Sequence, residues 1–225
     1  MQITDLKDLL HPVLYENISK RITELRPAQK KAITAGLLER KNLLICTPTA
    51  SGKTLIAEIA ALQGIYNRIG KAVYIVPLVA LASEKYHEFK EKYKDIRVGI
   101  ATGDLDSGDF YLEKNDLIIC TSEKLDSLMR HNTPWIRQLS TIIVDEIHLL
   151  NDPSRGPTLE VILTLLKTKL KNVQIIGLSA TIGNPKELAD WLNAELVVDD
   201  WRPVELHQGI YLDGEVEFYN YTLNK

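Results

Sequence analysis

Residues 47–54, TPTASGKT, have the residue types and spacing that could hold a phosphate group. In the P-loop pattern, backbone amides surround the phosphates, a lysine reaches the β- and γ-phosphate oxygens, and a hydroxyl binds Mg²⁺. Gly52, Lys53 and Thr54 fit that pattern, while Thr47 stands where its first glycine is usual. A helix that begins near Lys53 would add the positive end of its dipole. We therefore predict that a nucleotide is bound by Thr47, Pro48, Thr49, Ala50, Ser51, Gly52, Lys53 and Thr54.

A second polar group, Asp145, Glu146 and His148, follows the apolar run TIIV. Two adjacent carboxylates at the end of a buried strand are costly unless a cation or a polar substrate meets them. Asp145 suits a Mg²⁺ contact, direct or through water, and Glu146 suits activation of the water that attacks a phosphoanhydride. Alone, the carboxylates could be a solvated helix cap, and His148 a hydrogen-bonded structural residue. With the phosphate loop upstream, we predict catalytic roles for Lys53, Asp145 and Glu146, and a metal site at Thr54 and Asp145.

Seven short apolar runs must position these residues. Each is a continuous stretch rich in Val, Ile and Leu, which is typical of a strand buried on both faces. The runs are 42–46, 72–76, 97–101, 116–120, 141–145, 173–178 and 195–198. Amphipathic segments that are plausible helices lie at 53–68, 78–91, 122–131, 155–170 and 185–192. The alternation predicts an α/β fold, a mostly parallel sheet of about seven strands with helices on both faces.

Polar segments follow six of these runs directly. They are TPTASGKT, PLVALASEK, TGD, TSEK, DEIH and SAT. Ligands of such sheets bind beyond the carboxyl ends of the strands. We therefore expect the six segments to gather at one edge of the sheet, with Lys53 and Asp145 converging on a single magnesium-bound triphosphate.

The composition is ordinary for a globular protein. The 225 residues include 45% hydrophobic and 25% charged residues, and the formal net charge is −3. Because the bulk charge does not indicate a polyanion partner, bound nucleic acid would need a local groove. Cys46 and Cys120 each end an apolar run, so we predict two buried thiols rather than a disulfide or a zinc site. With no long apolar stretch and no signal-peptide pattern, we expect a cytoplasmic protein without a membrane partner.

The ordered set of motifs resembles superfamily 2 nucleic-acid helicases of the DExH type. TPTASGKT, DEIH and SAT resemble motifs I, II and III, ELRPAQKKAI resembles the Q motif, VPLVALASEKY motif Ia and TSEKLDSLMR motif Ib. SRGPTLE and DWRPVEL resemble the archaeal HelQ-type branch of the Ski-two-like helicases. The resemblance runs from about residue 15 to about residue 212. It implies the first RecA-like domain of a motor that uses ATP and Mg²⁺ to move 3′ to 5′ on single strands and unwind DNA, in replication-fork repair or recombination.

The resemblance also implies roles for individual residues. Gln29 would contact adenine through its amide, which can both donate and accept a hydrogen bond. His148 would act at the catalytic site and join the coupling residues Ser179, Ala180 and Thr181. Residues suited to backbone contacts would touch the phosphates of a single strand. These residues are Pro77, Leu78, Ala80, Gly103, Asp104, Thr121, Ser122 and Lys124. Without the resemblance, motif Ia would be an ordinary strand and helix, SAT a helix cap, and Gln29 a surface residue.

Two features depart from the family pattern. Val79 stands where this branch usually has an arginine, so one expected charged contact is missing. The chain also contains no Gly-Arg dipeptide, whereas the second RecA-like half of such motors carries its arginine finger in a QxxGRxGR motif. We therefore predict that residues 1–200 form the first RecA-like domain. Residues 201–225, with a hairpin turning at Asp213-Gly214, would lead toward an absent second half.

Three alternatives remain. One is a Ski-two-like RNA helicase, because loops that follow the backbone do not distinguish the bases. Another is a nucleotide-gated nucleic-acid-binding module without turnover, which would not need Glu146. A small-molecule P-loop kinase would need a substrate lid and predicts neither SAT nor the Q motif. The TSEK and DWRP segments favour single-stranded or forked DNA as the partner.

Overall fold

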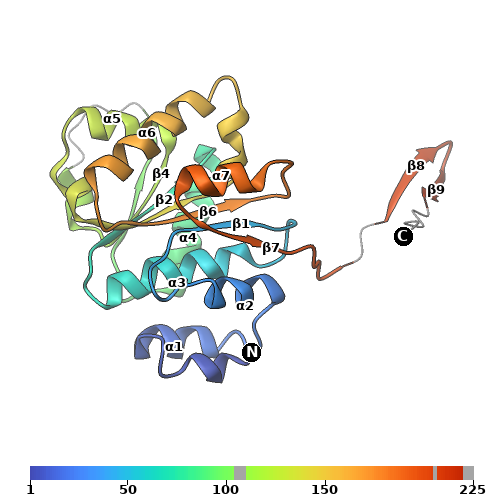
Figure 1. Ribbon diagram of the computed structural model, residues 1–225, viewed down its shortest axis with the longest axis horizontal. Helices are drawn as coiled ribbons and strands as arrows, with labels where there is room; N and C mark the ends of the chain where they lie inside the picture. The colour runs from blue at the N-terminus through green and yellow to red at the C-terminus, as the bar shows by residue number, and fades with distance from the viewer. Residues whose placement is uncertain (104–109, 205–206, 220–225) are drawn as a thin grey trace.

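The computed structural model describes residues 1–103, 110–204 and 207–219. Its centre is a seven-stranded sheet in the order β3-β4-β2-β5-β6-β1-β7, in which every pair of neighbours is parallel (Figure 1). The strands are β1 (Leu43–Cys46), β2 (Lys71–Val76), β3 (Val98–Ala101), β4 (Leu117–Thr121), β5 (Leu139–Val144), β6 (Gln174–Ser179) and β7 (Glu195–Val198). The predicted fold class is confirmed, and every predicted strand end lies within two residues of the observed one.

Helices cover both faces of the sheet (Figure 1). One face carries α1 (Pro12–Ser19), α2 (Pro27–Thr34), α3 (Lys53–Tyr66) and α4 (Val79–Lys92), and the other carries α5 (Ser122–Arg130), α6 (Gly156–Lys169) and α7 (Pro185–Leu192). Successive strand residues point to opposite faces. Tyr74 and Ile143 therefore pack with the first group of helices, while Val73 and Ile142 pack with the second. The five predicted helices are observed as α3 to α7.

Some elements were not predicted. The helices α1 and α2 are short, and each has a proline at its first position, where the missing N–H costs nothing. The 3₁₀ helices are η1 (Ile3–Leu6), η2 (Phe110–Lys114), η3 (Pro134–Gln138) and η4 (Ile147–Asn151). None of the helices in the described residues is long and apolar enough to span a membrane. Cys46 and Cys120 are free and buried.

The predicted hairpin is present as β8 (Gln208–Leu212) and β9 (Glu215–Tyr219), which pair antiparallel. Asp213 and Gly214 both have left-handed backbone, with φ of 50° and 91°. Two successive positive φ angles are what a two-residue type I′ turn requires. The hairpin lies apart from the seven-stranded sheet (Figure 1).

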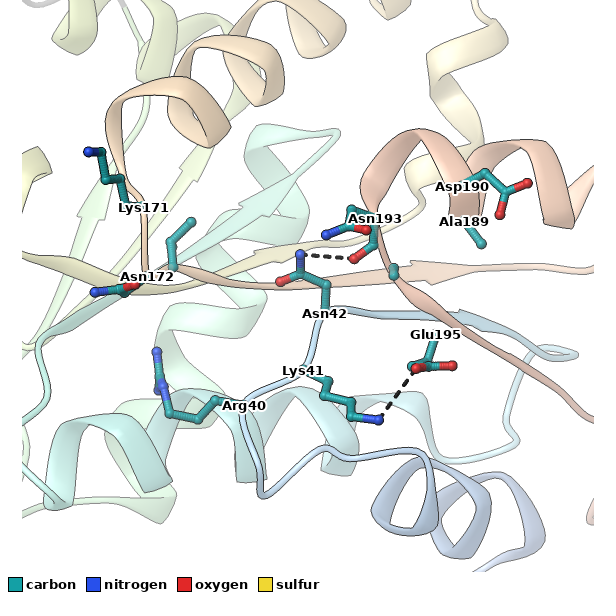
Figure 2. Close-up of a pocket in the computed structure, with 11 residues that line it drawn as sticks. Arg40, Lys41, Asn42, Lys171, Asn172, Ala189, Asp190, Asn193 and Glu195 are labelled. Atoms are coloured by element: carbon teal, nitrogen blue, oxygen red, sulfur yellow. Dashed lines mark hydrogen bonds and ion pairs between the residues drawn. The ribbon is translucent and has the colours of Figure 1, made fainter.

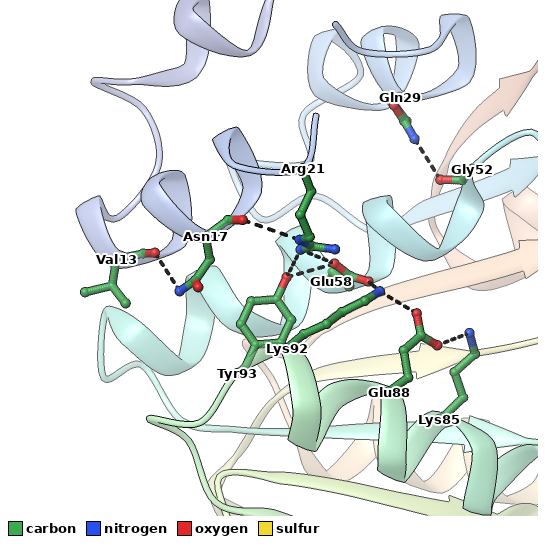
Figure 3. Close-up of polar contacts among 10 residues, drawn as sticks. All are labelled: Val13, Asn17, Arg21, Gln29, Gly52, Glu58, Lys85, Glu88, Lys92 and Tyr93. Atoms are coloured by element: carbon green, nitrogen blue, oxygen red, sulfur yellow. Dashed lines mark hydrogen bonds and ion pairs between the residues drawn. The ribbon is translucent and has the colours of Figure 1, made fainter. Parts of the chain in front are cut away.

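A buried carboxylate in α3, that of Glu58, fixes this helix to its neighbours (Figure 3). It accepts hydrogen bonds from Arg21 Nη2 at 3.1 Å, Lys92 Nζ at 2.8 Å and Tyr93 Oη at 2.8 Å. Lys92 also pairs with Glu88 of α4. A buried charge with this many partners stabilises one arrangement of the elements that contribute them. The helix that follows the phosphate loop is thereby held against the end of α1 and against α4.

Candidate functional site

The phosphate loop leaves β1 and turns sharply into α3. Ala50 and Gly52 have left-handed backbone, with φ of 65° and 93°. The positive φ at Gly52 favours glycine, and a Cβ added there would lie 2.4 Å from Gln29 Nε2 and would displace that amide. The hydroxyls of Thr47 and Ser51 lie 2.7 Å apart and share a hydrogen bond across the loop. Contacts within the chain therefore fix the conformation of the loop.

The ammonium group of Lys53 lies against carbonyl groups of its own surroundings. Its Nζ donates to Thr47 O at 3.0 Å and to Ser179 O at 2.8 Å. Burial lowers the pKa of Lys53, while the nearby carboxylates of Glu146 and Asp145 act in the opposite direction. The lysine and both carboxylates thus lie together at the carboxyl edge of β1, β6 and β5, the edge at which the sequence analysis expected them. Phosphate oxygens could replace the two carbonyls as acceptors.

Asp145 directly follows β5 and is held by three contacts. Its N–H donates to Ile75 O at 2.8 Å, its Oδ1 accepts from Glu146 N at 3.1 Å, and its Oδ2 accepts from Tyr74 Oη at 3.1 Å. Tyr74 is fully buried in β2, and burial, followed by the charge of Asp145, raises its pKa well above the ordinary value. The phenol therefore stays a hydrogen-bond donor and fixes the carboxylate. Sequence reasoning missed Tyr74.

Glu146 has left-handed backbone, with φ of 49° and ψ of 45°. A residue with a side chain holds such a conformation at a cost of order 1–3 kcal/mol, and such residues cluster at functional sites. His148 Nδ1 lies 3.4 Å from Glu146 Oε2, although without hydrogen-bond geometry. The left-handed turn directs the chain away from β5 and into η4 immediately after the two carboxylates.

The end of β6 meets the phosphate loop through its backbone. Ser179 O accepts a hydrogen bond from Thr47 N at 3.2 Å in addition to the one from Lys53. The Ser179 hydroxyl is buried beside the Cys46 thiol without hydrogen-bond geometry, and Thr181 is exposed. In the described residues, no hydrogen bond joins His148, Ser179 and Thr181, so their side-chain link stays a prediction. The carbonyl contact with Lys53 is a direct link that the sequence did not reveal.

Gln29 of α2 is buried and contacts the phosphate loop (Figure 3). Its Oε1 accepts from Arg26 N at 2.8 Å and its Nε2 donates to Gly52 O at 3.0 Å. Both ends of the amide are engaged, so a contact with adenine stays a prediction that requires one of these bonds to exchange. Arg26 donates to Ala50 O, and its guanidinium lies 5.5 Å from the ring centre of Trp201. Arg26 and Trp201 are candidates that sequence reasoning missed, although both lie in quoted motifs.

Beside this edge lies a groove with a cavity of about 480 Å³. It is lined by Pro77, Leu78, Val79, Gly103, Thr121, Glu123, Lys124, Ser127 and Arg155. Five of these were predicted to touch nucleic acid: Pro77, Leu78, Gly103, Thr121 and Lys124. Of the other three, Ala80 is exposed one residue past Val79, Ser122 lines a smaller cavity with Asp145 and Glu146, and Asp104 lies outside the described residues. Glu123, Ser127 and Arg155 were not predicted.

A larger cavity, of about 720 Å³, lies at the opposite edge of the sheet (Figure 2). It is formed at the amino ends of β1, β6 and β7 and contains none of the predicted site residues. Two pairs of its polar residues bind one another: Lys41 Nζ lies 3.4 Å from Glu195 Oε1, and Asn42 Nδ2 donates to Asn193 O at 3.2 Å (Figure 2). Cavity size therefore does not identify the functional site in this chain.

Known proteins resemble this chain in both sequence and structure. Residues 26–188 match the family DEAD/DEAH box helicase. The ATP-dependent DNA helicase Hel308 of Methanococcus vannielii is 59% identical over 207 residues, which cover 88% of this chain and 27% of that protein. Hel308 of Methanocaldococcus jannaschii is 60% identical over 207 residues, which cover 88% of this chain and 17% of that protein. The crystal structure of the DUF1998 helicase MrfA bound to DNA superposes with a TM-score of 0.74 at 27% identity, covering 86% of this chain and 30% of that one.

These matches confirm the helicase resemblance seen in the motifs. They also show that the chain spans only part of the length of these relatives, 27% of the first and 17% of the second. The matched residues run from the segment before Gln29 to α7 and so contain the phosphate loop, the DEIH segment and the groove.

Proposed function

We propose that this chain, which belongs to the DEAD/DEAH box helicase family, is the ATP-binding half of an ATP-dependent DNA helicase. The observation that carries the proposal is the gathering of Lys53, Asp145 and Glu146 at one edge of the sheet, next to a groove lined by predicted nucleic-acid contacts. The names of the relatives, all ATP-dependent DNA helicases, favour DNA over RNA as the partner.

The residues of the phosphate loop fit a magnesium-bound triphosphate. Lys53 Nζ has carbonyl partners that phosphate oxygens could replace, and the left-handed Gly52 turns the backbone into the start of α3. Thr54 and Asp145 would hold Mg²⁺, which neutralises charge on the β- and γ-phosphates when bound. Residues 47–54 and Gln29 would hold the nucleotide itself.

The chemistry that the chain contributes is positioning and proton transfer. Lys53 would bind the β- and γ-phosphate oxygens, and Glu146 would orient the attacking water and accept its proton. His148, whose Nδ1 lies 3.4 Å from Glu146 Oε2, would orient that carboxylate once a hydrogen bond forms between them. An arginine finger from a second RecA-like half would complete the site, so turnover by this half alone should be slower by about a thousandfold or more.

Coupling between nucleotide and nucleic acid would begin at the Ser179 carbonyl. Lys53 donates to this carbonyl in the structure, and a bound triphosphate would compete for the same ammonium. Loss of the hydrogen bond from Lys53 would free the Ser179 carbonyl, so the backbone at the end of β6 could shift. Ser179, Ala180 and Thr181 lie at this end. In the groove, Pro77, Thr121 and Lys124 would touch the phosphates of a single strand without contacting base edges.

The division of the chain is part of the same proposal. Residues 1–200 would form the first RecA-like domain, and residues 201–225, including the hairpin, would lead toward the second. The position of the hairpin outside the seven-stranded sheet supports this division.

ATP hydrolysis measured with and without single-stranded DNA tests the proposal. We expect slow hydrolysis by this chain, and DNA-stimulated hydrolysis by a longer protein that contains the second RecA-like half. Glu146→Gln should retain nucleotide binding and lose turnover in the longer protein. Fast hydrolysis by this chain alone, or stimulation of the longer protein by RNA but not by DNA, would overturn the proposal.

A further inference from the structure

Arg155 lies between the groove and the DEIH segment. It lines the cavity of about 480 Å³ together with Val79, and it also lines the small cavity that reaches Asp145 and Glu146. No role was predicted for this arginine, although it belongs to the quoted segment SRGPTLE. A cation at this position faces the space in which the sugar-phosphate backbone of a strand would lie.

The backbone at Arg155 is fixed by a local turn. Asp152 Oδ1 accepts hydrogen bonds from Ser154 N at 2.8 Å and Arg155 N at 2.9 Å. Asp152 O also accepts from Gly156 N at 2.8 Å. A Cβ at Gly156 would lie 2.2 Å from Leu150 O, so this close approach of two backbone segments requires glycine. The arginine side chain therefore projects from a rigid position at the start of α6.

The guanidinium of Arg155 has N–H groups that donate to no acceptor among the described residues. It donates one hydrogen bond, from Nη1 to Pro77 O at 3.2 Å, across 78 positions of sequence. A guanidinium carries five N–H donors, and their planar arrangement suits phosphate oxygens. Within the described part of the chain, no carboxylate forms an ion pair with Arg155. The Asp152 carboxylate interacts with the charge of Arg155 from beyond ion-pair distance, and it already accepts hydrogen bonds from Ser154 and from Arg155 N. The half-buried guanidinium is therefore stabilised further when water or an anion reaches its remaining N–H groups.

Val79, which also lines this groove, carries no charge. This side chain begins α4 and is 55% exposed, at the place where the family resemblance led us to expect an arginine. Glu123 also lines the groove and adds a negative charge, while Lys124 adds a positive one. The groove therefore needs a further cation if it is to hold a polyanion, and Arg155 is the arginine that lines it.

We propose that Arg155 contacts a phosphate of the bound single strand and supplies the positive charge that is missing at position 79. The inference rests on the proposed function of the groove in nucleic-acid binding. In this arrangement, the hydrogen bond to Pro77 O fixes the guanidinium beside Pro77 in the lining of the groove, and its remaining N–H groups meet the strand.

The number of phosphate contacts can be measured from the salt dependence of binding. For single strands, the slope of log K against log salt changes by about 0.7 for each phosphate that a protein cation neutralises. We would titrate this chain into a fluorescein-labelled oligothymidylate and follow anisotropy at a series of KCl concentrations. Arg155→Gln should reduce the slope by about 0.7, while Arg155→Lys should keep it because the charge is retained. Arg137→Gln, the same change at an exposed residue that lines a different cavity, is the matched control and should leave the slope unchanged.

A second substitution makes the test specific to the groove. Val79→Arg introduces a cation at another position in the lining of the same groove, and combined with Arg155→Gln it should restore the lost slope. Circular dichroism and thermal unfolding of each variant report whether its fold is intact. If folded Arg155→Gln binds more weakly but with an unchanged slope, Arg155 only supports the Pro77 loop. That result would overturn the role proposed for Arg155 and leave the proposed nucleic-acid function of the groove standing. Absence of salt-dependent binding by the unmodified chain would overturn the proposed nucleic-acid function as well.

Discussion

Tyr74→Phe should weaken the metal-dependent part of nucleotide binding and leave the rest intact. Tyr74 is fully buried in β2, and its hydroxyl donates to Asp145 Oδ2 at 3.1 Å. Once the phenol is lost, the bond from Glu146 N is the one hydrogen bond from a described residue that still fixes the Asp145 side chain. Since Asp145 is the proposed metal ligand of this site, its orientation sets how well Mg²⁺ is held.

The size of this effect follows from the geometry. A hydrogen bond to a charged group contributes about 1.5–3 kcal/mol, which corresponds to roughly 10- to 150-fold in an equilibrium constant. Asp145 is half-buried, so water can replace part of what the phenol provides. We therefore expect the lower end of this 10- to 150-fold range, a loss of about tenfold in apparent Mg²⁺ affinity. A loss of this size is typical when a residue that orients a metal ligand is removed.

The assay is a Mg²⁺ titration of the binding of a fluorescent ATP analogue, repeated in EDTA. Tyr74→Phe should shift the Mg²⁺ midpoint and leave nucleotide affinity in EDTA unchanged. Tyr66→Phe is the control, since Tyr66 Oη donates to Asp95 Oδ1 at 3.0 Å and is the same chemical change away from the site. An unshifted Mg²⁺ midpoint in Tyr74→Phe, or an equal shift in Tyr66→Phe, would refute the reasoning.

The remaining predictions concern stability. Glu58→Gln removes a buried charge with three partners, and we expect a loss of about 3 kcal/mol and a midpoint lower by roughly 6–12 °C in thermal unfolding. The exposed Glu91→Gln should change little, and equal midpoints for the two variants would contradict the role of Glu58. Burial raises the pKa of Glu88, but hydrogen bonds from Lys85 and Lys92 outweigh burial and hold it below the ordinary 4.5. Because the folded pKa is the lower one, the contribution of Glu88 is complete above pH 4.5 and is lost as the pH falls through the folded value. The difference in urea midpoint between the unmodified chain and Glu88→Gln should therefore shrink on acidification, and a difference independent of pH would count against this assignment.

The strands and the longer helices could be predicted because their signal is local. A continuous run such as DLIIC, most of which lies in the fully buried β4, predicts a strand of a parallel sheet, and its polar successor must then lie at the carboxyl edge. The edge strands β3 and β7 are only partly buried, because each has one neighbour. The helices α1 and α2 were missed because their apolar residues show only weak helical periodicity, although Pro12 and Pro27 marked their starts. The equally short α7 was predicted because its apolar residues lie clearly on one face.

The contacts that hold the site could not be predicted, because they join residues that are distant in sequence. Tyr74 and Asp145 are 71 positions apart, and Arg155 and Pro77 are 78 apart. A tyrosine inside an apolar run gives no sign that its hydroxyl will meet a carboxylate on the neighbouring strand. These pairings follow only from the strand order, in which β2 lies beside β5.

The position of a bound triphosphate tests the proposed site most directly. A crystal structure of this chain with Mg²⁺ and a non-hydrolysable ATP analogue should show the β- and γ-phosphates on Lys53 Nζ, with the ammonium released from Ser179 O. The metal should lie between Thr54 and Asp145, bound directly or through water. A triphosphate that leaves Lys53 on its carbonyls and lies elsewhere, for example in the cavity at the amino ends of β1, β6 and β7 (Figure 2), would contradict the proposal.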